Sequence, residues 1–186
     1  MSGPPGGAAV EALAADAFWR FSLGVYGRPG VAAACLALQD RDGLDVNLLL
    51  FAAWMGHERG LRLGVAGVQA AAGAVAAWQA EVVAPLRALR RRLKDGPPPA
   101  PDAATGVMRE HLKAVELEAE RVEQDTLQRL AATIPVEPAP AGPALAAENM
   151  RAVAGLPEGM ARSGTDARAA TREDIAALAA ALGAGA

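Results

Sequence analysis

The aromatic residues of this 186-residue chain occupy a single stretch of it. The three tryptophans, three phenylalanines and one tyrosine all lie between Phe18 and Trp78. Aromatic side chains bury more apolar surface than most others, so they concentrate the driving force for folding in this stretch. We therefore expect the hydrophobic core to form there, with the second half of the chain leaning on it or staying loose.

The composition favours helices over strands. Hydrophobic residues make up 52% of the chain, and alanine contributes more to that share than any branched or aromatic residue. Alanine is the best helix former and is depleted from strands. The length suits one domain with appendages. We expect an all-α fold, a small bundle of about five or six helices.

The net charge and hydropathy of the chain argue against nucleic acid and membranes as partners. A net charge of −3 and a pI near 5.4 give no long-range attraction for nucleic acid or for an anionic membrane. The most apolar stretch, 63–78, falls short of the roughly 20 residues that span a bilayer. No secretory or transit signal is recognised at the N-terminus, so we expect a cytoplasmic protein. The single cysteine, Cys35, is expected to be a buried apolar residue.

Turn-forming residues divide the first half of the chain into helices. A first helix is expected over 16–26, capped by its aspartate and apolar on so many sides that it should be central in the bundle. A second helix, 31–41, should end before Gly43, which suits a left-handed terminator. Asp45 should then cap a third helix.

Two longer helices are expected next, one after Gly60 with a break or kink at Pro85, and one capped by Asp102 that runs to about Leu130. Their apolar residues recur at steps of three and four, which predicts an antiparallel pair with these stripes buried. The stripes are Val75, Trp78, Val82, Leu86, Leu89 and Leu93 on the first helix, and Met108, Leu112, Val115, Ala119 and Val122 on the second.

The chain is expected to divide into three parts. Residues 1–9 should be disordered, residues 10–132 should form the helical bundle, and residues 133–186 should be a mostly disordered tail. The tail is rich in alanine, proline and glycine, a composition that buries too little apolar surface to offset the entropy lost on ordering. Within it, 144–154 and 172–182 can form short helices.

Signatures of catalysis and of metal binding are missing from the sequence. The aspartates around Gly43 resemble a calcium loop, but the EF-hand spacing would require leucines as the first and last ligands. The two histidines do not follow the Glu-x-x-His spacing of di-iron bundles. We predict no catalytic residues, no metal and no cofactor, and we favour a binding protein over an enzyme.

Two groups of residues are candidate binding sites. Around the turn at 39–47, polar side chains near two tryptophans could line a small-molecule site inside the bundle. These residues are Trp19, Gln39, Asp40, Asp45, Asn47 and Trp54.

The second candidate is the basic segment that contains Arg87, Arg90 and Arg91, which suits an acidic or phosphorylated partner. The alternative, which we favour, is pairing inside the hairpin with Glu116, Glu120 and Glu123 on the facing helix. The partner is expected to be another protein or a second copy of the chain. A small-molecule ligand and homo-oligomerisation through the Ala/Gly-rich face of 63–78 remain alternatives.

Several groups of residues resemble one known family. They include Phe18-Trp19, the run from Asp45 to Phe51, Pro85-Leu86-Arg87 and Ala119-Glu120-Arg121. This pattern, over about residues 16–130, is similar to an uncharacterised family of small proteobacterial proteins, domain of unknown function 2390. The resemblance implies a helical protein of the bacterial cytoplasm, and it brings no assigned reaction, cofactor or partner.

Overall fold

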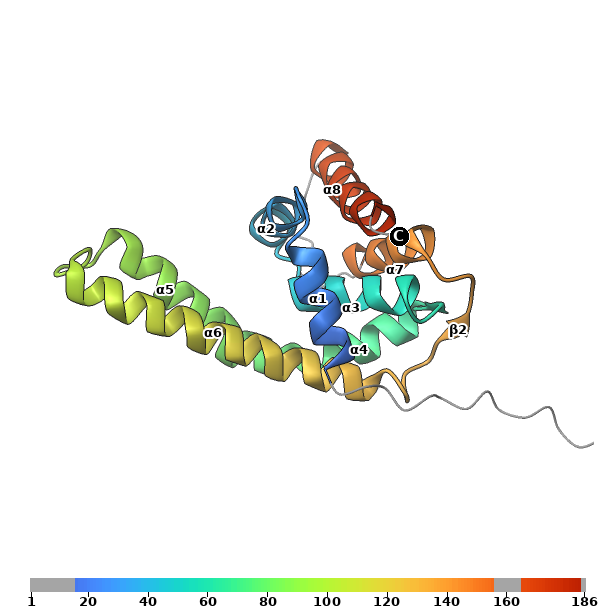
Figure 1. Cartoon of the computed structure of the whole chain (residues 1–186), viewed down its shortest axis with the longest axis horizontal. Coiled ribbons are helices and arrows are strands. Elements are labelled where there is room, and N and C mark those ends of the chain that lie inside the picture. The colour runs from blue at the N-terminus through green and yellow to red at the C-terminus, as the bar shows by residue number, and fades with distance from the viewer. Residues whose placement is uncertain (1–15, 156–164, 185–186) are drawn as a thin grey trace, which may run out of the picture.

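The computed structural model describes residues 16–155 and 165–184, and helices account for most of them (Figure 1). The all-α prediction is confirmed, with more helices than the five or six expected. The expected disordered segment 1–9 lies outside the described residues. In chain order the elements are α1 (Ala17–Tyr26), α2 (Val31–Asp42), α3 (Val46–His57), β1 (Leu61–Arg62), α4 (Val65–Trp78), the π-helical turn η1 (Gln79–Val83), α5 (Ala84–Asp95), α6 (Ala103–Leu130), β2 (Glu137–Pro138), α7 (Pro143–Ala154) and α8 (Thr165–Gly183).

The helices form a body and an arm. Helices α1, α2, α3, α4, α7 and α8 gather into the body, while α5 and the first part of α6 extend away from it as an antiparallel hairpin (Figure 1). We call residues 79–122 the arm. The predicted antiparallel pair is therefore confirmed, but the pair projects from the core instead of forming it. The strands β1 and β2 make a short antiparallel ladder at the edge of the body.

Helix α3 is the centre of the body. Ten of its twelve residues are buried, among them Leu49, Phe51, Trp54 and Met55. The Phe18 ring of α1 packs against two of these, with ring centroids 5.7 Å from Phe51 and 5.4 Å from Trp54. The predicted aromatic core is confirmed for these rings. A helix that is apolar on every side takes the interior position, since no face of it tolerates water.

Helix α1 is not the central helix that its sequence predicts. Phe18, Phe21 and Val25 are buried, but Leu23 and Tyr26 on its second stripe are exposed. Helix α3 fills the interior instead, and the second stripe of α1 faces a cleft described below. The predicted cap at Asp16 is also wrong, since its side chain makes no capping hydrogen bond.

The prediction of a mostly disordered tail is wrong for the described parts of 133–186. Helix α7 matches the short helix expected over 144–154, and α8 contains the one expected over 172–182. Both bury their apolar edges in the common core, with Met150 and Val153 from α7 and Ile175, Leu178 and Leu182 from α8, and Leu145 of α7 is buried as well. Composition misled here because alanines on these helices allow close packing, so little apolar surface per residue suffices.

Helix α7 lies unusually close to α3. A Cβ atom placed on Gly56 would come within 2.6 Å of the backbone nitrogen of Ala146. The fully buried Asn149 amide donates to the carbonyls of Ala52 (3.2 Å) and Leu61 (2.9 Å) and accepts from the Leu63 N–H (2.9 Å). Buried polar groups are stabilising only when satisfied, as this amide is. Helix α7 is therefore an integral part of the body.

The end of α2 and the starts of α3 and α6 lie where the sequence predicts them. Gly43 ends α2 at φ 67°, in the left-handed region that favours glycine. The Asp45 carboxylate accepts from the N–H groups of Asn47 (2.8 Å) and Leu48 (3.3 Å), so it caps α3. Asp102 and Thr105 form a reciprocal capping box at the start of α6. These predictions are confirmed.

The break at Pro85 takes the form of a π-helical turn. Pro85 is the second residue of α5, directly after η1. Proline has no N–H to donate to the preceding turn, and a widened turn accommodates that missing hydrogen bond.

Among the described helices, none is long and apolar enough to cross a bilayer by itself. Helices α1 and α2 meet that test only as a pair, and the pair is bent by 99°.

Candidate functional site

A cleft of about 300 Å³ lies between the body and the arm. Helices α1, α2 and α3 form its body side, and α5 and α6 form its arm side. Its walls combine aromatic, aliphatic, amide and charged side chains, which is the mixture typical of ligand sites. The lining residues are Trp19, Ser22, Leu23, Tyr26, Leu36, Gln39, Val46, Asn47, Leu50, Arg87, Arg90, Arg91, Lys113, Glu116, Leu117, Glu120 and Gln124.

Residues of both predicted sites meet in this one cleft. Those that line it are Trp19, Gln39, Asn47, Arg87, Arg90 and Arg91. Asp40 lies beside it, because its carboxylate pairs with Arg91 at 2.8 Å. Asp45 caps α3 instead of facing the cleft, and Trp54 is in the core with 1% of its surface exposed. The two sites that we treated as separate in the sequence therefore form a single feature.

A network of ion pairs forms the arm side of the cleft. Arg87 Nε donates to Glu116 (3.0 Å) and its Nη2 to Glu120 (2.6 Å), while Arg90 Nε donates to the other oxygen of Glu116 (2.5 Å). Burial alone would raise the pKa of Glu116, but the hydrogen bonds from Arg90 and Arg87 outweigh it and lower that pKa. The geometry agrees with the internal pairing that we favoured for Arg87 and Arg90.

A buried chain of polar side chains joins α3 to α6 behind the cleft. Gln124 Nε2 donates to Asn47 Oδ1 (2.8 Å), and Asn47 Nδ2 donates to Glu123 Oε2 (3.1 Å). Glu123 is 1% exposed, and burial together with the nearby Asp45 carboxylate raises its pKa well above the ordinary value.

Glu123 Oε1 has no hydrogen-bond donor among the described residues, and the Glu123 carboxyl group interacts with the Asp45 carboxylate. Two carboxylates can share a hydrogen bond only when one of them carries a proton. A proton on Glu123 therefore satisfies both groups, and we take the buried side chain to be the neutral acid. Glu123 was predicted to pair with the basic segment, and that prediction is wrong.

Two residues that line the cleft carry polar atoms without a partner in the described structure. These are Ser22 Oγ and Gln124 Oε1, and both residues are nearly fully buried. At the edge of the cleft, the Arg121 guanidinium lies 5.7 Å from the centroid of the Trp19 ring. Two residues that line the cleft thus each have a buried polar atom without a partner in the part of the chain that the structure describes, and an aromatic ring lies beside them.

The sequence analysis missed Ser22, Tyr26, Lys113 and Gln124 as lining residues. The signal that would have revealed the α6 residues is the recurrence of Glu116, Glu120, Gln124 and Leu127 at intervals of three and four. That row faces the basic residues of α5 and the body, and we had assigned α6 a different buried face.

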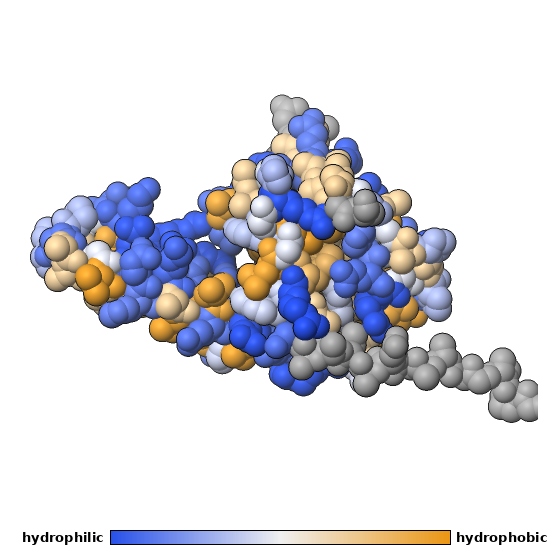
Figure 2. All heavy atoms as spheres, viewed as in Figure 1, coloured by the Kyte–Doolittle hydropathy of each residue, from blue (hydrophilic) through white to orange (hydrophobic). Residues whose placement is uncertain are grey.

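The predicted buried stripe of the arm is in fact largely exposed. Leu89, Met108, Val115 and Val122 are 43%, 48%, 47% and 46% exposed, and α5 has no buried residue at all. The prediction fails because two packed helices bury only the part of each apolar face that points at the other helix, and the rest of each face stays exposed. Figure 2 shows apolar patches along the arm among hydrophilic side chains. We call these four residues, with the partly buried Leu86, Leu93 and Leu112, the apolar stripe.

The exposed residues of the apolar stripe on α6 and the ion-paired glutamates occupy different sides of that helix. Successive residues of a helix are about 100° apart, so Val115 points well away from Glu116 and Glu120. Among the residues of the apolar stripe, none lines the cleft. By helical spacing, three charged residues flank the line of the stripe: Arg92 toward the tip of the arm, and Glu118 and Asp125 on the side of the body. In the described part of the chain, no ion pair involves these three residues.

Metal-binding and thiol chemistry find little support in the described residues. No group of three or more His, Cys, Asp or Glu side chains there could hold a metal ion. Gly43 and Asp45 act as helix terminator and cap, as expected from the failed calcium-loop spacing. Cys35 is fully buried, and burial raises the pKa of its thiol to about 12, which suppresses the reactive thiolate.

Comparison with known families gives one match. The family described as "Protein of unknown function (DUF2390)" matches residues 17–127, more than half of the chain. The chain belongs to this family. The DUF2390 match spans the cleft and the arm, and it ends before α7 and α8. No curated protein and no solved structure matches the chain.

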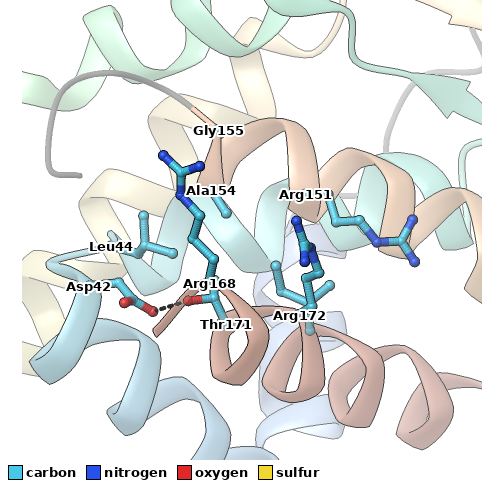
Figure 3. A pocket seen from close by; sticks show the side chains of 9 residues that line it. Asp42, Leu44, Arg151, Ala154, Gly155, Arg168, Thr171 and Arg172 are labelled. Carbon is cyan, nitrogen blue, oxygen red and sulfur yellow. Dashed lines mark hydrogen bonds between the residues drawn. The ribbon is translucent and has the colours of Figure 1, made fainter. Parts of the chain in front are cut away.

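A second hollow of this DUF2390 protein, about 320 Å³, lies where α7 and α8, which are outside the matched region, meet the end of α2 (Figure 3). Arg151, Arg168 and Arg172 surround it, and Thr171 Oγ1 donates to Asp42 (2.9 Å) at its edge. Gly155, at its rim, adjoins residues 156–164, which the structure does not describe. The sequence analysis missed this hollow because it treated α7 and α8 as a tail.

Proposed function

We propose that this protein is a helical protein-binding module that docks through the apolar stripe of its arm, and that the docking partner is a second copy of the chain. The observation that carries the proposal is the exposure of the stripe. Helix α5 contains three leucines and buries no residue, and Met108, Val115 and Val122 repeat every seven residues on α6. Regularly spaced apolar residues on a projecting element are typical of an interaction site.

The pattern of the stripe favours a helical partner. A two-helix hairpin that exposes an apolar seven-residue repeat has the form of half a four-helix bundle. A second hairpin would cover the exposed apolar residues. A heptad spacing also keeps the apolar residues in register with a facing helix over the length of the arm. An identical hairpin supplies the complementary pattern.

The charges that border the stripe favour an antiparallel arrangement of two copies. Arg92 lies at the tip of the arm, and Glu118 and Asp125 lie toward its base. If two arms pair tip to base about a twofold axis, Arg92 of each copy comes toward Glu118 and Asp125 of the other. A parallel arrangement would place like charges together. This complementarity supports a second copy in preference to an unrelated partner.

Sedimentation across a range of concentrations tests the proposal. Wild-type protein should show a dimer that dissociates on dilution. Val115→Asp should weaken dimerisation at least about tenfold, because a carboxylate would have to be buried in an apolar interface. Val115 is half exposed in the single chain, so the variant should remain folded, which a thermal melt followed by circular dichroism verifies.

Ala74→Glu is the matched control, since Ala74 lies on the exposed Ala/Gly-rich face of α4. It should sediment as the wild type does. A wild-type monomer at every concentration overturns the proposal. A dimer that Ala74→Glu disrupts and Val115→Asp leaves intact also overturns it, and supports association through 63–78 instead.

A further inference from the structure

The cleft between body and arm has an apolar side and a charged side, and this combination indicates which kind of ligand it suits. The body side is largely apolar and aromatic, with Trp19, Leu23 and Leu50 among its residues. The arm side carries cations, of which Arg87 and Arg90 are engaged by Glu116 and Glu120. An apolar wall next to fixed cations suits a molecule with an apolar body and one anionic group.

Two cations at the rim of the cleft are free to be recruited by such a molecule. Arg91 is held only by Asp40, and both side chains are about half exposed. Lys113 has a single long contact, 3.9 Å to Glu110, and is largely exposed. Exposed ion pairs contribute only about 0–1 kcal/mol, so an incoming anion can replace them with little loss.

The inner part of the cleft offers hydrogen-bonding groups. Ser22 and Gln124 line it, and the structure gives neither Ser22 Oγ nor Gln124 Oε1 a partner. Gln124 already uses its amide nitrogen on Asn47, so its oxygen remains as an acceptor. Leaving a buried polar atom unpaired is costly, and a ligand hydroxyl or amino group would relieve that cost after a small side-chain rotation.

We infer that the cleft binds a small amphipathic organic anion, with its apolar or aromatic body against the Trp19 wall and its anionic group between Arg91 and Lys113. The volume of about 300 Å³ is at the lower end of the range for small-molecule sites and admits a compact ligand of two or three rings. This inference does not depend on docking through the apolar stripe, since no residue of the stripe lines the cleft.

Fluorescence titration with a matched pair of probes tests the inference. The anionic probe is 8-anilinonaphthalene-1-sulfonate, and N-phenyl-1-naphthylamine offers nearly the same rings without the charge. The wild type should bind the anionic probe saturably with one site per chain and should bind the neutral probe more weakly. In the double variant Arg91→Gln with Lys113→Gln, affinity for the anionic probe should fall about tenfold, as expected for lost charge-assisted contacts. Affinity for the neutral probe should be unchanged.

Arg92→Gln is the matched control, because Arg92 is the next residue of the same helix and does not line the cleft. It should leave both affinities as in the wild type. All these substitutions are at exposed positions, so folding should be preserved. The inference is overturned by an absence of saturable binding, by an equal loss in Arg92→Gln and in the double variant, or by unchanged affinity in the double variant. Binding that Val115→Asp abolishes places the probe on the apolar stripe and overturns it as well.

Discussion

Replacing the buried Glu123 by glutamine should make the protein more stable at neutral and alkaline pH. Glutamine has nearly the same shape as the protonated acid. Its oxygen can accept from Asn47 Nδ2, and its amide can donate to the Asp45 carboxylate, so both contacts of Glu123 are kept. The substitution removes the free-energy cost of keeping the Glu123 carboxyl group protonated in the folded state.

The sign and size of the effect follow from the raised pKa of Glu123, whose ordinary value is 4.5. At low pH the group is protonated in both the folded and the unfolded chain, and the variant and the wild type should be about equally stable. Above pH 4.5 the unfolded chain ionises while the folded one does not, so wild-type stability falls with pH. The loss is at most about 1.4 kcal/mol per pH unit, which gives up to about 3 kcal/mol at pH 7.

Urea unfolding of Glu123→Gln and wild type, at several values between pH 5 and pH 8, measures this difference. The stability advantage of the variant should grow steadily with pH, and effects of other ionisable groups cancel in the comparison. Glu118→Gln, at an exposed position of the same helix, should show a much flatter difference. A variant that is less stable than the wild type at pH 8, or a difference that does not vary with pH, would show that Glu123 is charged in the fold and refute the reasoning.

Two further predictions concern the packing of the body. A chain that ends at residue 132 should show reduced helicity and no cooperative thermal transition by circular dichroism, because it loses six large buried side chains of α7 and α8, worth roughly 10 kcal/mol together. A cooperative melt of that fragment with a full helical signal would contradict the placement of these helices. Gly56→Ala should destabilise the protein by about 3 kcal/mol in urea, since its Cβ would meet the α7 backbone at 2.6 Å. Gly73→Ala, where no atom lies within 4 Å, should instead stabilise α4 by about 0.5–1 kcal/mol, and equal effects of the two substitutions would contradict the close approach of α3 and α7.

Local features of the fold were predictable from the sequence. Gly43, Asp45 and Asp102 act where their chemistry predicts, because terminators and caps depend on neighbouring backbone groups alone. The pairing of Arg87 and Arg90 with Glu116 was also predictable, since the Gly96–Pro99 break places α5 and α6 side by side.

Features that depend on distant parts of the chain were not predictable. Helix α7 is stable because α3 offers it an apolar surface, and α8 is stable because α2 and α7 do; nothing within the sequences of α7 and α8 indicates those surfaces. The apolar face of α6 has the spacing of a buried stripe, yet only Ala119 of that stripe is buried in the single chain. The cleft brings together Trp19, Asn47 and Arg90 from three helices, and the relative placement of those helices is a property of the packing.

The two sides of the arm differ in mechanical character. Helix α6 runs without interruption for 28 residues, from its capping box at the tip to Leu127 in the core, whereas the opposite side is broken by the π-helical turn before α5. Any force applied at the tip is therefore transmitted along one stiff rod to Gln124 and Glu123, while η1 is the place where the hairpin can flex. A displacement of the arm would consequently reach the inner wall of the cleft before it reached the rest of the body.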